Sequence, residues 1–109
     1  MYYICVEDFH KKAQEVKRLT REEEKLCAAA MKAGDQEARM QLIESYYPMV
    51  SGCLKRFPKE LQTIKSLYTC LQSLEQGVDK FNFLQDSESF THHLSRRLRQ
   101  CLTRCIADR

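Results

Sequence analysis

Residues 61–81 read LQTIKSLYTCLQSLEQGVDKF, and this stretch decides the fold class of the chain. Its large apolar side chains return at steps of three and four residues, which places them on one stripe of an α-helix. A stripe of that length has to be covered over its whole extent, either by other helices of the same chain or by a second copy in a dimer seam. We expect the first arrangement, in which the stripe is part of the hydrophobic core of the single chain. Its members are Leu61, Ile64, Leu67, Tyr68, Leu71, Leu74 and Val78.

The other segments repeat the helical period, and little in the sequence favours a sheet. The chain has three Gly and two Pro, and it lacks the Asn-Gly and Asp-Gly pairs that mark hairpins between alternating runs. A length of 109 residues suits one small domain. We therefore predict an all-α fold, a compact bundle of about five helices around a single core.

Capping residues place the boundaries of the first helices. An apolar period predicts a first helix over residues 6–18. Thr20 and Glu23 have the spacing of a capping box, which predicts that the second helix begins there. Gly34 permits a left-handed turn at the end of that helix, and Asp35 should cap the next one.

A proline interrupts the helix predicted in the middle of the chain. Residues 36–57 carry one apolar stripe, but Pro48 removes a backbone amide donor inside it. We therefore expect a kink or a break near Tyr46 or Tyr47.

The positive charge of the chain is concentrated at its C-terminal end. The net charge is only +3, but residues 89–109 hold five Arg against Asp108 alone, so the rest of the chain has a net charge of −1. Just before this basic segment, residues 82–88 are polar and predict a loop, with Ser87 or Ser89 capping a last helix. Such an asymmetry is typical of a patch for an anionic partner.

A helical projection separates two sides of this last helix. Phe90, Leu94 and Leu98 mark the core side. The opposite side suits nucleic acid, because guanidinium groups bind phosphate and Gln or Thr can hydrogen-bond base edges. An ordinary solvated helix face is the alternative. The residues on this opposite side are His93, Arg96, Gln100, Thr103, Arg104 and Ala107, with Arg97 at its edge.

Residue spacing and the lengths of apolar runs exclude several function classes. The six cysteines form no C-x-x-C pair and have no His at ligand spacing, so we expect reduced core thiols, no metal and no cofactor. No apolar run reaches the roughly 18 residues of a membrane span. The N-terminus does not read as a secretory signal, so we expect a cytoplasmic protein without a membrane partner. The chain has no nucleophile–base pair, paired-carboxylate site or glycine-rich phosphate loop, and we do not expect an enzyme.

Six strings in register over residues 19–109 resemble the central domain, regions one-point-two and two, of bacterial sigma factors of the sigma-seventy class. The strings are LTREEE at 19–24, KAGDQEAR at 32–39, LIESYYPMV at 42–50, LKRF at 54–57, VDKFN at 78–82 and LRQCLTRCIAD at 98–108. The resemblance divides the chain into an N-terminal helical extension, residues 1–18, and a sigma region-two-like helical domain, residues 19–109.

The resemblance implies a helical domain that docks on the beta-prime subunit of RNA polymerase core and recognises the promoter minus-ten element. In the family, the helix that matches residues 90–108 meets the DNA. Its Gln and Thr positions correspond to Gln100 and Thr103, and nearby basic positions correspond to Arg99 and Arg104. Together with the projection, this gives the expected DNA-binding set: His93, Arg96, Arg97, Arg99, Gln100, Thr103 and Arg104.

The chain departs from the family pattern in two places. Arg96 and Arg97 stand where the family carries an aromatic pair that helps to open the duplex; arginine grips phosphate but provides no apolar wedge. The docking helix of the family carries D-L-I-Q-E-G where residues 65–70 read KSLYTC. Both acidic positions are lost, so Lys65 should weaken or redirect docking. The expected docking residues are Lys65, Leu67, Tyr68 and Thr69.

Two functions follow from the resemblance. The first is a sigma-factor-like transcription initiation protein that binds RNA polymerase core and contacts promoter DNA through its last helix. The second is a degenerate sigma-like interaction module, an accessory subunit or regulator of transcription, without autonomous promoter opening. Neither hypothesis includes a reader of the minus-thirty-five element, so we expect either a fragment of a longer protein or a separate partner chain that supplies this reader.

Overall fold

The expected all-α class is confirmed. The computed structural model describes residue 3, residues 5–81 and residues 89–107, and over these residues it contains six α-helices, one short 3-10 turn and no strand. The helices are α1 Val6–Glu15, α2 Arg21–Lys32, α3 Gln36–Glu44, α4 Tyr47–Lys55, α5 Ile64–Lys80 and α6 Phe90–Ala107, and the 3-10 turn η1 spans Lys59–Leu61.

Three local signals act as the sequence predicts. Thr20 and Glu23 form a capping box, in which the Thr20 amide donates to Glu23 Oε1 over 2.9 Å and the Glu23 amide donates to Thr20 Oγ1 over 3.1 Å. Gly34 has a φ of 100°, in the left-handed region that a Cβ atom disfavours. Asp35 then accepts two backbone amides at the start of α3. All three predictions are confirmed. Each of them depends only on residues that lie close together in the sequence.

The break predicted at Pro48 is also present, and it raises the number of α-helices from about five to six. α3 ends at Glu44 and α4 begins at Tyr47, so Pro48 lies in the first turn of α4. A proline loses no hydrogen bond there, because the first amides of a helix have no partner within it.

One of the two candidate capping serines can be assigned at the start of α6. Ser89 Oγ accepts the His92 amide over 3.1 Å. The alternative cap, Ser87, and the loop predicted over residues 82–88 lie outside the described residues.

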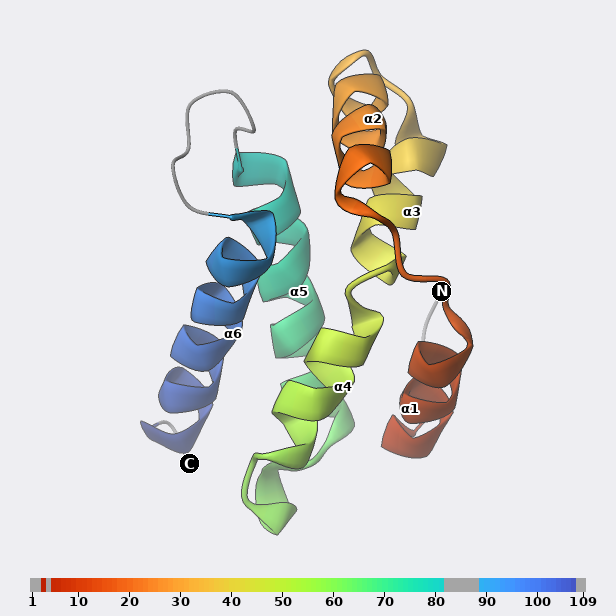
Figure 1. Cartoon of the computed structure of the whole chain (residues 1–109). Coiled ribbons are helices and arrows are strands. Elements are labelled where there is room, and N and C mark those ends of the chain that lie inside the picture. The colour runs from red at the N-terminus through yellow and green to blue at the C-terminus, as the bar shows by residue number, and fades with distance from the viewer. Residues whose placement is uncertain (1–2, 4, 82–88, 108–109) are drawn as a thin grey trace.

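The helices pack around one core, and α5 lies in its middle. Figure 1 shows α5 alongside α6, α4 close to both, α1 against α4, and the α2–α3 hairpin at one end. Leu67, Leu74 and Val78 of α5 have no exposed area, so these members of the apolar stripe belong to the core of the single chain, as expected. The other members, Leu61, Ile64, Tyr68 and Leu71, are half-buried. Phe9 of α1 is equally buried, so the expected N-terminal extension contributes to the same core.

Burial divides the cysteines into two groups. None of the six forms a disulfide, as expected. The sequence predicts that all six are core residues, but only three of them are buried. The buried cysteines are Cys53, Cys70 and Cys101, and the half-buried ones are Cys5, Cys27 and Cys105.

Among the described helices, none is both long and apolar enough to cross a membrane.

Candidate nucleic-acid interface

Two helices hold α6, and this contact decides which side of α6 is exposed. α6 packs against α5 and also against α4. Because the two neighbours cover different flanks, the buried side chains of α6 spread over a wide arc. They are Phe90, His93, Leu94, Leu98 and Cys101.

Outside this arc, α6 presents a basic and polar surface. Its exposed polar side chains surround or border an open hollow of about 570 Å³. α6 contains four Arg and no Asp or Glu, so its own charges are all positive. We call this surface the α6 face and define it by His92, Arg96, Arg99, Gln100, Thr103 and Arg104; all but Arg104 line the hollow.

The side chains of the α6 face suit a phosphate-rich partner. A guanidinium offers five N–H donors to phosphate oxygens, whereas the Gln100 amide both donates and accepts, as a base edge requires. The Thr103 hydroxyl donates to the Arg99 carbonyl over 3.1 Å. This bond holds the Thr103 side chain against the helix and leaves its oxygen available as an acceptor.

His93 does not belong to the α6 face, and the expectation that it is exposed is wrong. It is buried, and its ring lies 5.1 Å from the ring of Phe81, centroid to centroid. The projection placed His93 on the exposed side because it was centred on the aliphatic residues of α6. Phe81, the residue that follows α5, packs on the flank next to those residues, so the buried arc extends to His93.

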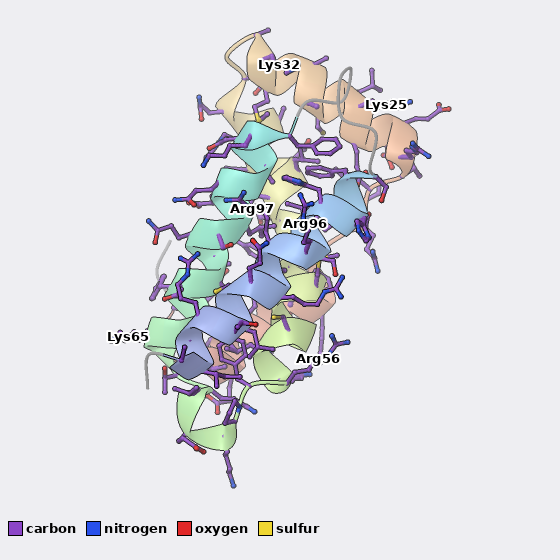
Figure 2. The ribbon with its side chains drawn as sticks, turned by 90° about the vertical axis from the view of Figure 1, so that its left-hand side faces the viewer. Lys25, Lys32, Arg56, Lys65, Arg96 and Arg97 are labelled. Carbon is purple, nitrogen blue, oxygen red and sulfur yellow. The ribbon has the colours of Figure 1, made fainter. Side chains whose placement is uncertain are left out.

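Arg97 lies at the border of the α6 face, with its side chain packed on α5. The residue is half-buried, and its Nε atom is buried without a hydrogen-bond partner in the part of the chain that the structure describes. A Cβ atom at Gly77 of α5 would stand only 2.9 Å from Arg97 Cδ. Figure 2 shows Arg97 toward α5 and Arg96 farther from it. Only the terminal nitrogens of Arg97 are therefore candidates for contact with a ligand.

A second hollow extends the basic surface onto α4. It has a volume of about 260 Å³ and is lined by Arg56 at the end of α4 and by Arg99 of α6. Figure 2 shows Arg56 below Arg96 and Arg97. The remaining lining residues are Pro48, Met49, Gly52, Cys53, Ser95 and Leu98.

Sequence reasoning missed both Arg56 and His92, for different reasons. Arg56 lies on another helix, so no period within α6 could identify it. His92 could have been found, because residues 92, 96, 100 and 103 have the spacing of one helix face.

The four expected docking residues of α5 do not form one exposed surface. Leu67 has no exposed area, so its expected contact with a partner is wrong: it fills the core. The Tyr68 hydroxyl accepts the Tyr3 amide over 2.7 Å, which ties it to the N-terminal segment. The half-buried Thr69 donates its hydroxyl to the Lys65 carbonyl over 3.0 Å. Lys65 alone among the four is exposed.

No protein-family model matches the chain. Within the described ranges, no three His, Cys, Asp or Glu side chains come together in a way that could hold a metal ion. The function of the α6 face therefore has to be argued from its own chemistry.

Proposed function

We propose that this protein is a sigma-factor-like transcription initiation protein that binds RNA polymerase core and contacts the promoter minus-ten element through α6. The observation that carries the proposal is the α6 face itself, where Arg96, Arg99, Gln100 and Thr103 line one open hollow. The same Gln and Thr positions correspond to the DNA-reading positions in the sigma-factor resemblance. The exposed surface of α6 and the family resemblance thus select Gln100 and Thr103 independently.

The charges of the face fit a duplex or a single strand held by its phosphates. Arg96 and Arg99 supply the sequence-independent part of the affinity, because each neutralised phosphate releases condensed counterions. Gln100 and Thr103 supply hydrogen bonds to base edges. Arg56, across the smaller hollow from Arg99, offers a further phosphate contact from α4.

The alternative function is a degenerate sigma-like interaction module without autonomous promoter opening. Arg97 supports this alternative, because its side chain packs on α5 beside Gly77 and so presents little of itself to an unstacked base. Arg96 is exposed, but it lacks the apolar ring that holds an unpaired base in a stack. A module that docks on a transcription protein but does not melt the promoter would depend on a partner to open the DNA.

A binding titration tests the contact with DNA. Fluorescence anisotropy is recorded with labelled minus-ten single strand and duplex, with and without core polymerase, over a range of salt concentrations. Arg99→Ala should weaken binding and lower the slope of log K against log salt by about 1. Lys25→Ala, which removes one charge from the exposed side of α2, should leave the slope unchanged. Absence of salt-dependent binding under every condition would sink the proposed contact with DNA.

A pull-down separates the two functions. Recovery of core polymerase by the tagged chain supports the initiation protein. Recovery of a different transcription protein without polymerase supports the interaction module.

A further inference from the structure

Two buried cysteine side chains meet at the contact between α5 and α6. Cys70 Sγ lies 3.6 Å from Cys101 Sγ. Cys70 has no exposed area, and Cys101 is 3% exposed. The proposed function does not use either residue, because both side chains point into the core while the α6 face looks outward.

The two thiols have unequal acidities, and the difference provides one nucleophile and one donor. The hydrogen bond from Cys70 lowers the pKa of the Cys101 thiol to about 7, with help from Cys105 and from the charge of Arg104. The same contact raises the pKa of Cys70, so Cys70 is the partner that keeps its proton. A thiolate is the reactive form of cysteine, so Cys101 is the reactive member of the pair.

A third buried thiol provides an internal comparison. Cys53 of α4 is also in the core, where its thiol donates to the Leu98 carbonyl over 3.7 Å. A hydrogen bond with Cys70 also lowers the pKa of the Cys53 thiol, against the effect of burial. Cys53 is therefore the competing partner of Cys70, and a disulfide between these two residues is the alternative product.

We propose that Cys70 and Cys101 form a peroxide-sensitive modification site that closes to a disulfide and links α5 to α6. The sulfur atoms need to approach by only about 1.5 Å to reach a disulfide bond length of about 2.05 Å. Cys101 lies in the last two turns of α6, and helix ends open more readily than core segments, which gives a small oxidant access.

The oxidation balances with a peroxide as the oxidant. The Cys101 thiolate attacks one oxygen of hydrogen peroxide, the O–O bond breaks, and protonation gives Cys101 sulfenic acid and water. The Cys70 sulfur then attacks the sulfenic sulfur and displaces the hydroxyl group, which leaves as a second water with the thiol proton. Two thiols and one peroxide thus yield one disulfide and two waters.

A peptide map tests the proposal on the unmodified chain. Trypsin places each of the relevant cysteines in a different peptide: Cys53 in residues 40–55, Cys70 in 66–80, Cys101 in 100–104 and Cys105 in 105–109. Dilute protein is treated with hydrogen peroxide, the remaining thiols are alkylated, the monomer is isolated, and the non-reduced digest is analysed by mass spectrometry. The expected product is a cross-link between peptides 66–80 and 100–104 that dithiothreitol removes.

The other products contradict the proposal. A cross-link from 66–80 to 40–55, a cross-link from 100–104 to 105–109, a disulfide found only between chains, or unmodified Cys70 and Cys101 would each overturn it. Cys70→Ser should abolish the cross-link, and Cys53→Ser should leave it intact. The oxidised parent chain should also melt on the order of 10 °C higher than the reduced chain, because the bond restricts the unfolded state. The peptide map of the parent chain decides the question even where a Ser variant does not fold.

Discussion

The side chain of Arg97 lies across Gly77, and this contact sets how closely α5 and α6 approach. A Cβ atom added at residue 77 would lie 2.9 Å from Arg97 Cδ and 2.7 Å from Leu94 Cδ2. Leu94 has no exposed area, so it has little room to move. The pairing of the two helices therefore depends on the missing side chain of Gly77.

Gly77→Ala should destabilise the protein even though alanine favours helices. The helical preference for alanine over glycine is worth about 1 kcal/mol. Forcing a methyl group into a packed core costs about 1–3 kcal/mol. We expect a net loss in the free energy of unfolding, measured by urea denaturation followed by circular dichroism.

Gly52→Ala is the matched control, because it makes the same change in α4. A Cβ atom at Gly52 would meet nothing within 4 Å. This variant should gain up to about 1 kcal/mol from helix propensity alone. Equal stabilisation by both substitutions would contradict the close approach of Arg97 and Leu94 to Gly77.

Tyr46 connects three parts of the fold through its hydroxyl group. The hydroxyl donates to the carboxylate of Glu24 in α2 and lies 2.9 Å from Thr91 Oγ1 in α6. Tyr46→Phe leaves the buried Glu24 carboxylate without its Tyr46 donor, so the free energy of unfolding should fall by about 1–3 kcal/mol. A double-mutant cycle with Glu24→Ala, which removes the acceptor, measures the coupling. Additive effects of the two substitutions would show that the bond carries no stability.

Glu24 should make the protein less stable as the pH rises from acidic values toward neutral. Burial raises the pKa of its carboxyl above the ordinary value of 4.5, so the unfolded chain releases the proton first. The contribution of Glu24 to stability is therefore fully present below 4.5 and is lost as the pH rises through the folded-state pKa. Glu24→Gln should flatten this loss in urea titrations between pH 4 and pH 7. A parallel decline in the variant would assign the loss to another group.

Asp79 should show the opposite dependence. Arg39 of α3 donates to both of its carboxylate oxygens, over 2.8 and 2.9 Å, and this holds the pKa of Asp79 below its ordinary value of 3.8. Its contribution is present above 3.8 and is lost as the pH falls through the folded-state pKa. The pair is partly exposed, so Asp79→Asn should cost no more than about 1 kcal/mol at pH 7. The cost should vanish near pH 2; a cost that persists there would exclude the charge as its source.

The sequence predicts those parts of the fold that neighbouring residues determine. The capping box of Thr20 and Glu23, the turn at Gly34 and the break at Pro48 all follow from steric and hydrogen-bonding needs within a few residues. The apolar stripe of α5 likewise predicts a buried helix, because its period is long and regular.

The orientation of α6 could not be predicted in full, because two other helices determine it. A projection of α6 alone gives the direction of its aliphatic residues, but Phe81 also covers His93, and α5 covers part of Arg97. Arg56 joins the same basic surface from α4, at a distance in sequence that no local pattern spans. One part of the candidate site therefore follows from the local sequence of α6, and the other part depends on how α4 and α5 pack against it.

Lys65 provides a direct test of the proposed docking on polymerase. It is the exposed member of the expected docking set, and it stands where the sigma-factor pattern carries an acidic residue that faces a basic partner. Lys65→Asp should therefore strengthen binding to core polymerase by about tenfold, because it replaces a like-charge contact with an opposite-charge one. The affinity is measured by titrating immobilised core polymerase at low and high salt. Lys25→Asp makes the same change on α2 and should leave the affinity unaltered. An equal gain in both variants would indicate general charge attraction, and no gain from Lys65→Asp would remove this end of α5 from the docking surface.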